Sequence, residues 1–172
     1  MDTKNKEINI DLQDFFSMIY TKNDLVLFYK EIDQVIAELF KSSEGTEHVL
    51  GETLSSEKKQ KIMAFLKASG IELSDQVKVQ EQLQIIKELG NLLPVVSLVL
   101  AFEPTAKNIR NISLWFNRSL DQKVLLDITL ERTIIGGAHI SFEGLYHDAT
   151  LKTTINHLLD TKSYLYSKGS IF

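Results

Sequence analysis

The sequence lacks cysteine altogether and contains only 2 prolines in its 172 residues. Without thiols, the protein has neither disulfide bridges nor cysteine chemistry at a catalytic or metal site. A long apolar stretch is also missing, because no run approaches the ~20 residues that a membrane-spanning helix requires. Residues 1–7 have no apolar core and no arginine, so we expect no targeting segment and no membrane span.

Strong positive charge is absent as well, because the formal net charge is -4. Residues 1–90 contain 16 acidic and 11 basic side chains, whereas residues 91–172 contain 7 acidic and 8 basic ones. Neither half has the basic stripe that contacts a phosphate backbone, so nucleic-acid binding is not expected. The acidity of the first half suits a basic partner helix, and solvated helix faces explain it equally well.

The first half of the chain has the pattern of a helical domain. Hydrophobic residues make up 44% of the chain and charged residues 24%, which is typical of a globular protein. Residues 21–24 have the form of a capping box that opens a long helix. A short helix at 8–19, a loop at 42–51 and two helices at 55–70 and 74–90 complete the predicted domain. The apolar stripe of the long helix consists of Leu25, Phe28, Ile32, Val35, Ile36, Leu39 and Phe40.

Beyond Pro94 the periodicity changes from helical to strand-like. A continuous apolar run at 95–102 predicts a buried strand, and a second strand is expected at 123–129. A helix is predicted between them at 105–120. Its core face is expected to consist of Ile109, Ile112, Trp115, Phe116 and Leu120.

A helical region followed by a small mixed sheet is an α+β arrangement. We therefore expect a helical domain at 1–90 and an α+β domain at 91–172. The boundary is placed between Gly90 and Pro94, because a helix-ending glycine and a proline coincide there with the change of period.

A glycine pair in the second half is the most informative local feature. Ile135 runs into Gly136 and Gly137, and an alternating segment follows at 138–142. Two glycines at the head of a strand predict a bend, a positive φ or a close backbone approach. The alternation predicts a half-buried strand.

The segment after this strand has the pattern of a hairpin that leads into a helix. Glu143–Gly144 is expected to form a two-residue turn, followed by a return strand at 145–147. Asp148 then has the position of an N-cap residue. The stripe of the last helix is expected to include Leu151, Ile155, Leu158 and Leu159.

The ordered run from Lys123 to Asp148 resembles the C-terminal domain of the delta subunit of F-type ATP synthases, the family of the oligomycin-sensitivity-conferring protein. That family has an Ile-Gly-Gly run, an alternating strand, an aspartate and a C-terminal helix in this order. Here 130–137 matches the glycine-pair run, and the aspartate falls in register without a gap. The resemblance covers about residues 94–160, and it identifies Ile135, Gly136, Gly137 and Asp148 as a structural motif.

The resemblance implies a non-enzymatic peripheral-stalk (stator) subunit at the cytoplasmic face of a bacterial cell membrane. It implies that the helical domain holds alpha subunits of the catalytic head and that the C-terminal domain binds subunit b. The N-terminal region departs from the family, because it lacks the tyrosine-alanine opening and shows fewer than the family's six helices. The alternatives are a small soluble α+β ligand-binding or enzymatic domain, or a stalk subunit of another rotary ATPase.

The 4 histidines are the best catalytic or metal-binding candidates, but their predicted positions keep them apart. His139 and His147 fall on opposite faces of the hairpin, because successive pairs alternate. His48 is expected in a loop and His157 on the last helix. No ligand spacing typical of a metal site occurs, so we expect neither a metal nor a cofactor.

Carboxylates and glycines show no catalytic arrangement either. Asp127, Glu131 and Asp148 are expected on a strand, in a loop and at a helix cap, where nothing brings them together. The pair Gly136–Gly137 leads into a strand, whereas a phosphate loop leads into a helix N-terminus. Two arginines of the helix at 105–120 are expected on its solvated side. We therefore expect no enzymatic activity.

Overall fold

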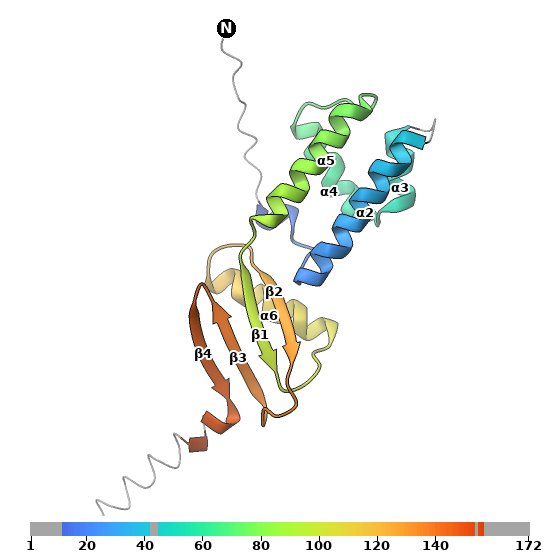
Figure 1. Ribbon diagram of the computed structural model, residues 1–172. Helices are drawn as coiled ribbons and strands as arrows, with labels where there is room; N and C mark the ends of the chain where they lie inside the picture. Colours follow the sequence, from blue (N-terminus) through green and yellow to red (C-terminus); the bar gives the residue numbers. More distant parts are fainter. Residues whose placement is uncertain (1–11, 42–44, 154, 157–172) are drawn as a thin grey trace, which may run out of the picture.

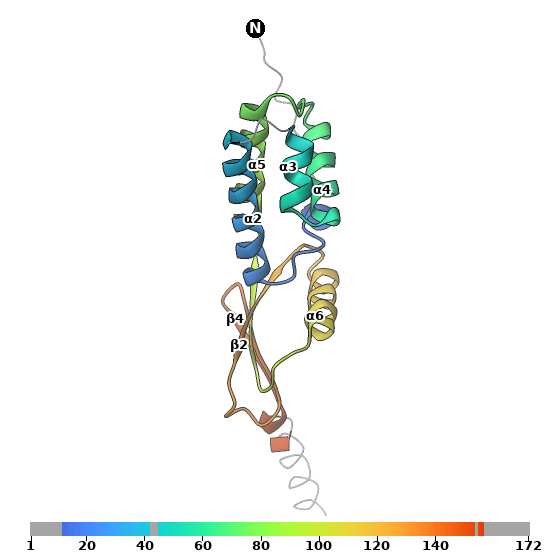
Figure 2. The same cartoon turned by 90° about the vertical axis from the view of Figure 1, so that its right-hand side faces the viewer.

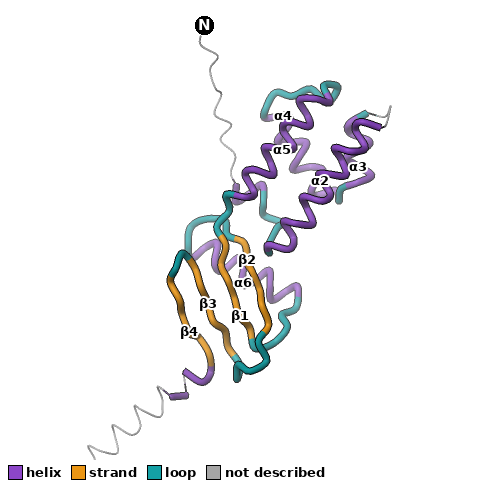
Figure 3. Tube along the Cα trace, in the orientation of Figure 1, coloured by secondary structure: helices purple, strands orange, loops and turns teal. Residues whose placement is uncertain are grey.

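The computed structural model describes residues 12–41, 45–153 and 155–156. Within these ranges a helical bundle precedes a sheet that carries one further helix, as Figures 1 and 3 show. The predicted α+β fold is thus confirmed. None of the described helices has both the length and the apolar character needed to cross a membrane. The elements are α1 (Leu12–Phe15), α2 (Lys22–Lys41), α3 (Thr46–Thr53), α4 (Ser56–Ala68), α5 (Gln76–Asn91), β1 (Val95–Leu100), α6 (Ala106–Ser119), β2 (Leu125–Leu130), β3 (Gly137–Phe142) and β4 (Leu145–Thr150).

Helix α2 begins at the predicted capping box. The Asp24 backbone N–H donates to the Thr21 hydroxyl oxygen at 3.0 Å, and the Thr21 N–H donates to the Asp24 carboxylate at 2.9 Å. These reciprocal bonds satisfy two backbone donors that a helix start leaves free. The buried side chains of α2 recur at helical spacing and are Leu25, Phe28, Ile32, Val35 and Leu39.

Helix α4 ends at Gly70, as predicted. Gly70 has a φ of +69°, its N–H donates to the Lys67 carbonyl at 3.0 Å, and the Ile71 N–H donates to the Leu66 carbonyl at 3.0 Å. This pair of bonds is the Schellman arrangement, in which a left-handed residue just beyond the helix satisfies its last carbonyls.

The segment 42–51, predicted to be a loop, contains most of helix α3 instead. The Thr46 hydroxyl donates to the Leu73 carbonyl at 2.5 Å, and Val49 and Leu50 are buried. A helix of 8 residues is too short to be stable alone, so its contacts with the bundle stabilise it.

In the bundle, the structure differs from the sequence prediction at three further points. Asp75, rather than Ser74, is the N-cap of α5, and its carboxylate accepts a backbone N–H of the first turn at 3.2 Å. Phe40, predicted in the core, is 69% exposed, because it lies about 100° around α2 from the last buried residue. Of the helix predicted at 8–19, α1 forms the middle part, and residues 8–11 lie outside the described residues.

The sheet has the strand order β2-β1-β3-β4. Strands β1 and β2 are parallel, and the other two pairs are antiparallel. Helix α6 connects β1 to β2 and covers one face, while the opposite face carries no helix of the described chain (Figures 1 and 2). Strand β1 ends before the predicted position 102, where Phe102 is 56% exposed. The face toward α6 is apolar and includes Val96, Leu98, Leu100, Leu126, Ile128, Ala138, Ile140 and Phe142.

Two buried clusters meet where β1 and β2 begin. One fills the bundle and includes Leu93 and Leu125, whereas the other lies between the sheet and α6 and includes Val96 and Leu126. Because side chains alternate along a strand, two consecutive residues of β2 serve different clusters. The chain passes from one cluster to the other close to the expected domain boundary. That the two halves are separate domains stays a prediction.

Lys123 is a buried cation at this junction. Only 3% of its surface is exposed, and its ammonium has no hydrogen-bond partner among the described residues. The ammonium lies 5.6 Å from the centre of the Tyr20 ring, which offers a cation–π contact. Burial disfavours the charged form and lowers the pKa of Lys123 to about 8, against a smaller opposing effect of the Asp24 carboxylate.

We expect the folded state to gain stability as the pH rises from about 8 to 10.5, the ordinary pKa of lysine. In this window the unfolded chain still holds the Lys123 proton while the folded chain releases it. The variant Lys123→Met lacks this pH dependence and is more stable at neutral pH by ~1–3 kcal/mol, because no charge is buried. Urea unfolding below and above the window measures both effects, with the exposed Lys107→Met as control. Parallel pH profiles of wild type and Lys123→Met would contradict this expectation.

Candidate partner-binding site

The glycine pair adopts the backbone that its sequence predicts. Gly136 and Gly137 have φ values of +76° and +88°. A side chain on Gly136 would press on Leu151, and one on Gly137 would collide with the backbone of Ala149 and Thr150. The Gly136 carbonyl also accepts the Leu151 N–H at 3.1 Å. The end of β4 and the next helical turn therefore pack directly against the glycine pair.

The hairpin between β3 and β4 has the predicted turn and register. Glu143 and Gly144 have φ values of +47° and +79°, as a tight two-residue turn requires. The antiparallel register places His139 opposite Asp148 and extends to the pair Gly137–Thr150. The hairpin is thus paired along all six residues of each strand.

Asp148 lies within β4 and is not the N-cap that the sequence predicts. The strand continues to Thr150, because Gly137 lets the two backbones approach there. The Asp148 carboxylate accepts the Thr150 N–H at 2.9 Å and the Thr153 hydroxyl at 2.8 Å. These hydrogen bonds, led by the one from the Thr150 backbone, lower the pKa of Asp148 to about 2, with a small contribution from His139. Asp148 still joins the strand end to the following helical turn.

Exposed apolar side chains gather at the end of the sheet where β2 and β4 terminate. Ile135 of the motif is 70% exposed, whereas the two glycines are half-buried. Leu130 at the end of β2 is 46% exposed, and Leu151 is 50% exposed. In the last predicted helix Ile155 is 49% exposed, and Leu158 and Leu159 lie outside the described residues.

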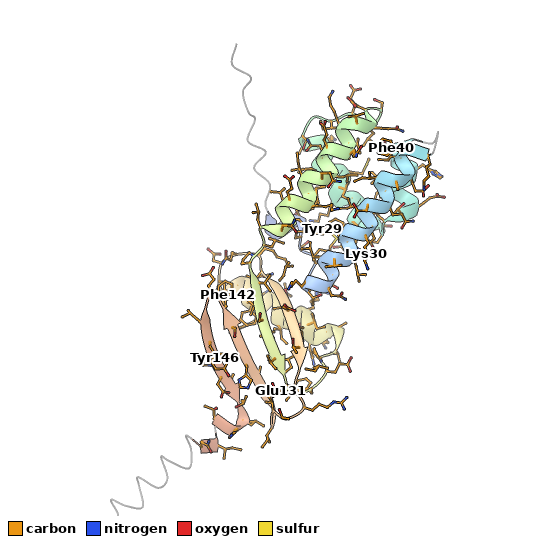
Figure 4. All side chains as sticks on the ribbon, viewed as in Figure 1. Tyr29, Lys30, Phe40, Glu131, Phe142 and Tyr146 are labelled. Atoms are coloured by element: carbon orange, nitrogen blue, oxygen red, sulfur yellow. The ribbon has the colours of Figure 1, made fainter. Side chains whose placement is uncertain are left out.

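His139 takes part in a small polar cluster on the sheet face that carries no helix. Its Nδ1 atom lies 2.5 Å from the Tyr146 hydroxyl and 3.6 Å from the Asp148 carboxylate, and the His139 and Tyr146 rings stack. Figure 4 shows Tyr146 on β4. His147 pairs with Ile140 and so falls on the opposite face, as predicted. Within the described residues, no group of metal-ligating side chains of sufficient number comes together.

The other candidate polar residues are dispersed. His48 lies on α3 rather than in a loop, and His157 lies outside the described residues. Asp127 forms an ion pair with Lys22 at 3.1 Å, and Glu131 follows the end of β2 and accepts a neighbouring hydroxyl. These two carboxylates and Asp148 are distributed over both edges of the sheet, so they do not form one site.

An apolar recess beside α6 is better suited to a partner than any of these polar groups. Its volume is about 350 Å³, and its walls are strands β1 and β3 and one flank of α6. Trp115 stands on its rim, 59% exposed, and packs edge-on against the buried Phe116 with ring centroids 4.8 Å apart. The side chains that line the recess are Leu98, Leu100, Asn111, Ile112, Trp115, Phe116, Ala138 and Ile140.

The sequence predicts Trp115 in the core, and this prediction is wrong. The face of α6 that touches the sheet carries Phe116 and the fully buried Ser113, and Trp115 lies about 100° around the helix from Phe116. A signal for its exposure exists in the sequence. Leu114, Trp115 and Phe116 are consecutive, and three consecutive residues of a helix do not fit on one narrow face.

Comparison with known proteins leaves the family open. No family model matches the chain, and no curated protein matches it. Among similar solved structures is a chain of the Toxoplasma gondii mitochondrial ATP synthase hexamer studied by cryo-electron microscopy. It is 13% identical, with a TM-score of 0.35 over 87% of this chain and 93% of that chain. Similarity at this level carries no weight for fold or function, so the function proposed below rests on the chain's own residues.

Gly137→Ala is expected to destabilise the sheet by ~2–4 kcal/mol, because it combines a strained positive φ with a backbone collision. Gly144→Ala is the matched control: its φ is also positive, but nothing lies within 4 Å of the added methyl group. The control should therefore lose only ~1–2 kcal/mol. Urea unfolding, followed by Trp115 fluorescence, measures the difference. Equal losses in the two variants would show that the close approach to β4 does not matter.

Proposed function

We propose that this protein is a non-enzymatic peripheral-stalk subunit of a bacterial F-type ATP synthase, peripheral at the cytoplasmic face of the cell membrane. The support comes from the run Lys123–Asp148, whose strand, glycine pair, tight turn and return strand follow the order of the delta-subunit resemblance. The observation that carries the proposal is Gly137. Its positive φ and its contact with β4 give a physical reason for a glycine pair at this point.

A subunit of this kind transmits force and turns over no substrate. Rotary catalysis produces torque, so the catalytic head must be tethered to the membrane sector. A tether depends on large, slowly dissociating interfaces. The chain suits this role because its bundle and its sheet lie at opposite ends of an elongated molecule, as Figure 2 shows. Two partners can therefore be held at separate surfaces.

The recess beside α6 is the proposed site for the end of subunit b. Its floor of Leu98, Leu100 and Ile140 is apolar, and Trp115 provides an exposed aromatic anchor on the rim. An amphipathic helix that fills such a groove does so with apolar side chains at helical spacing. Aromatic side chains that the partner buries contribute much of the binding free energy in such interfaces.

The bundle is the proposed site for alpha subunits of the catalytic head. Helices α2 and α5 pack beside each other and both carry exposed apolar side chains. Figure 4 shows Phe40 near the end of α2 that lies farthest from the sheet. Exposed apolar side chains on neighbouring helices mark a surface that a partner helix can cover. The residues concerned are Val26, Leu27, Phe40, Val77, Ile85 and Leu92.

The proposal includes no turnover by the chain itself. Among the described residues, His139, Tyr146 and Asp148 come closest to a catalytic set. They lie on a sheet face without a covering helix, whereas catalysis favours a recess from which water is excluded. A hydrogen-bonded cluster that holds the end of β4 explains their arrangement.

We expect the full chain to bind a peptide from the C-terminal end of the same organism's subunit b. Isothermal titration calorimetry should give a dissociation constant of ~10 μM or tighter. Trp115→Ala should weaken binding by about tenfold or more, because an aromatic anchor that the bound helix buries is lost. Phe40→Ala is the matched control, since Phe40 is equally aromatic and exposed but lies on the bundle.

Two results would contradict the proposal. The first is no binding of the subunit b peptide by the folded chain at ~100 μM, far above the expected dissociation constant. The second is substrate turnover that is lost when His139 is replaced, which would favour an enzymatic α+β domain.

A further inference from the structure

A second recess lies on the other flank of α6 and is not used by the function proposed above. Its volume is about 820 Å³, and it is formed by β2, the first turns of α6 and the start of α2. Its lining combines apolar side chains, among them Ile109 and Ile128, with charged ones. Volumes of this size are typical of ligand sites. The chemistry of its walls indicates which ligand fits.

One wall is the free edge of strand β2. Strand β2 is at the end of the sheet, and only its beginning is covered, by a parallel bridge between Thr21 and Leu126. In this bridge the Leu126 N–H donates outward to the Tyr20 carbonyl at 2.9 Å. Since backbone groups alternate in direction along a strand, the N–H groups of Ile128 and Leu130 also point outward. Neither has a backbone partner in the described part of the chain.

The bridge shows that this edge accepts an extended segment. The chain adds a residue to β2 at Thr21 and then turns away into α2, so the edge beyond Leu126 is left unoccupied. Unpaired N–H and C=O groups at a sheet edge are a template for an added strand. Helix α6 borders this edge, so an added strand would contact α6 through its side chains as well as β2 through its backbone.

The opposite wall carries an excess of positive charge. Lys107 and Arg110 are three residues apart on α6, both are exposed, and neither forms an ion pair within the described residues. Two of the three carboxylates that line the recess already have partners. Asp24 accepts two backbone N–H groups, and Asp127 pairs with Lys22 at 3.1 Å. The lining as a whole carries three cations and three carboxylates, but on the side of α6 the two cations stand against the single carboxylate of Glu103.

We propose that this recess binds an extended, acidic segment of a partner protein, which pairs with β2 as an additional strand. The backbone of the segment hydrogen-bonds to Ile128 and Leu130. An apolar side chain of the segment packs against Ile109 and Ile128, and an acidic one two residues away meets Lys107 and Arg110. Strand addition of this type takes affinity from backbone bonds and specificity from alternate side chains. The site lies across α6 from the Trp115 recess, so it does not depend on the stalk assignment.

The probe is a capped hexapeptide, Ser-Val-Ser-Glu-Ser-Val, in which valine and glutamate are two residues apart and so share one face of the strand; it is titrated into the isotope-labelled full chain. We expect saturable changes in the amide resonances of Ile128 and Leu130. The double variant Lys107→Glu/Arg110→Glu should weaken binding by about tenfold or more, because attraction becomes repulsion. Arg118→Glu, at the far end of the same helix, is the control for charge reversal outside the recess and should bind as the wild type does.

A second variant tests the backbone contact. Leu130→Pro removes an outward N–H and leaves the ladder with β1 intact, because proline is tolerated at a strand edge. It should abolish binding without lowering the midpoint of thermal unfolding. Absence of β2 resonance changes at a peptide concentration of ~1 mM would overturn the proposal. So would equal affinity for a peptide with N-methylated backbone, or displacement by inorganic phosphate, since either result shows a simple anion site.

Discussion

The structure depends on the first residues of β1 and β2, which contribute side chains to both buried clusters. Because a strand directs successive side chains to opposite sides, Leu125 enters the bundle while Leu126 enters the space under α6. A shift of one residue in this register would exchange the two side chains and disturb both clusters at once. The chain before α2 strengthens this junction of the two clusters, because Thr21 pairs with Leu126 and caps α2 at the same time. The buried Lys123 lies beside this junction, with its ammonium over the Tyr20 ring.

At the other end of the sheet, backbone contact takes the place of side-chain packing. Gly137 has no Cβ atom, so Thr150 can approach and β4 pairs over its full length. Asp148 then reaches the Thr150 N–H and the Thr153 hydroxyl, which connects the strand to the following helical turn. The motif residues therefore act on structure, and the surface that a partner can contact consists of other side chains.

Helix α6 divides the sheet face into two different surfaces. Its buried side carries Ser113 and Phe116, and its flanks are left to line the recesses. On the flank of Trp115 the recess is apolar, which suits a helix with an apolar stripe. On the flank of Lys107 and Arg110 the recess combines charge with a free strand edge, which suits an extended acidic segment. One helix thus presents two surfaces of different chemistry.

The sequence by itself determined the features that arise between residues close together in the chain. Among these are the capping box of α2, the helix end at Gly70, the turn at Glu143 and the α+β order of elements. Only the tertiary structure decided which of Leu114, Trp115 and Phe116 is buried, that α3 is a helix and that β4 extends past Asp148. It also created both recesses, whose walls come from segments far apart in the sequence. The physical reason is the same in each case: local hydrogen bonds follow from neighbouring residues, whereas burial and close approach depend on which distant segments meet.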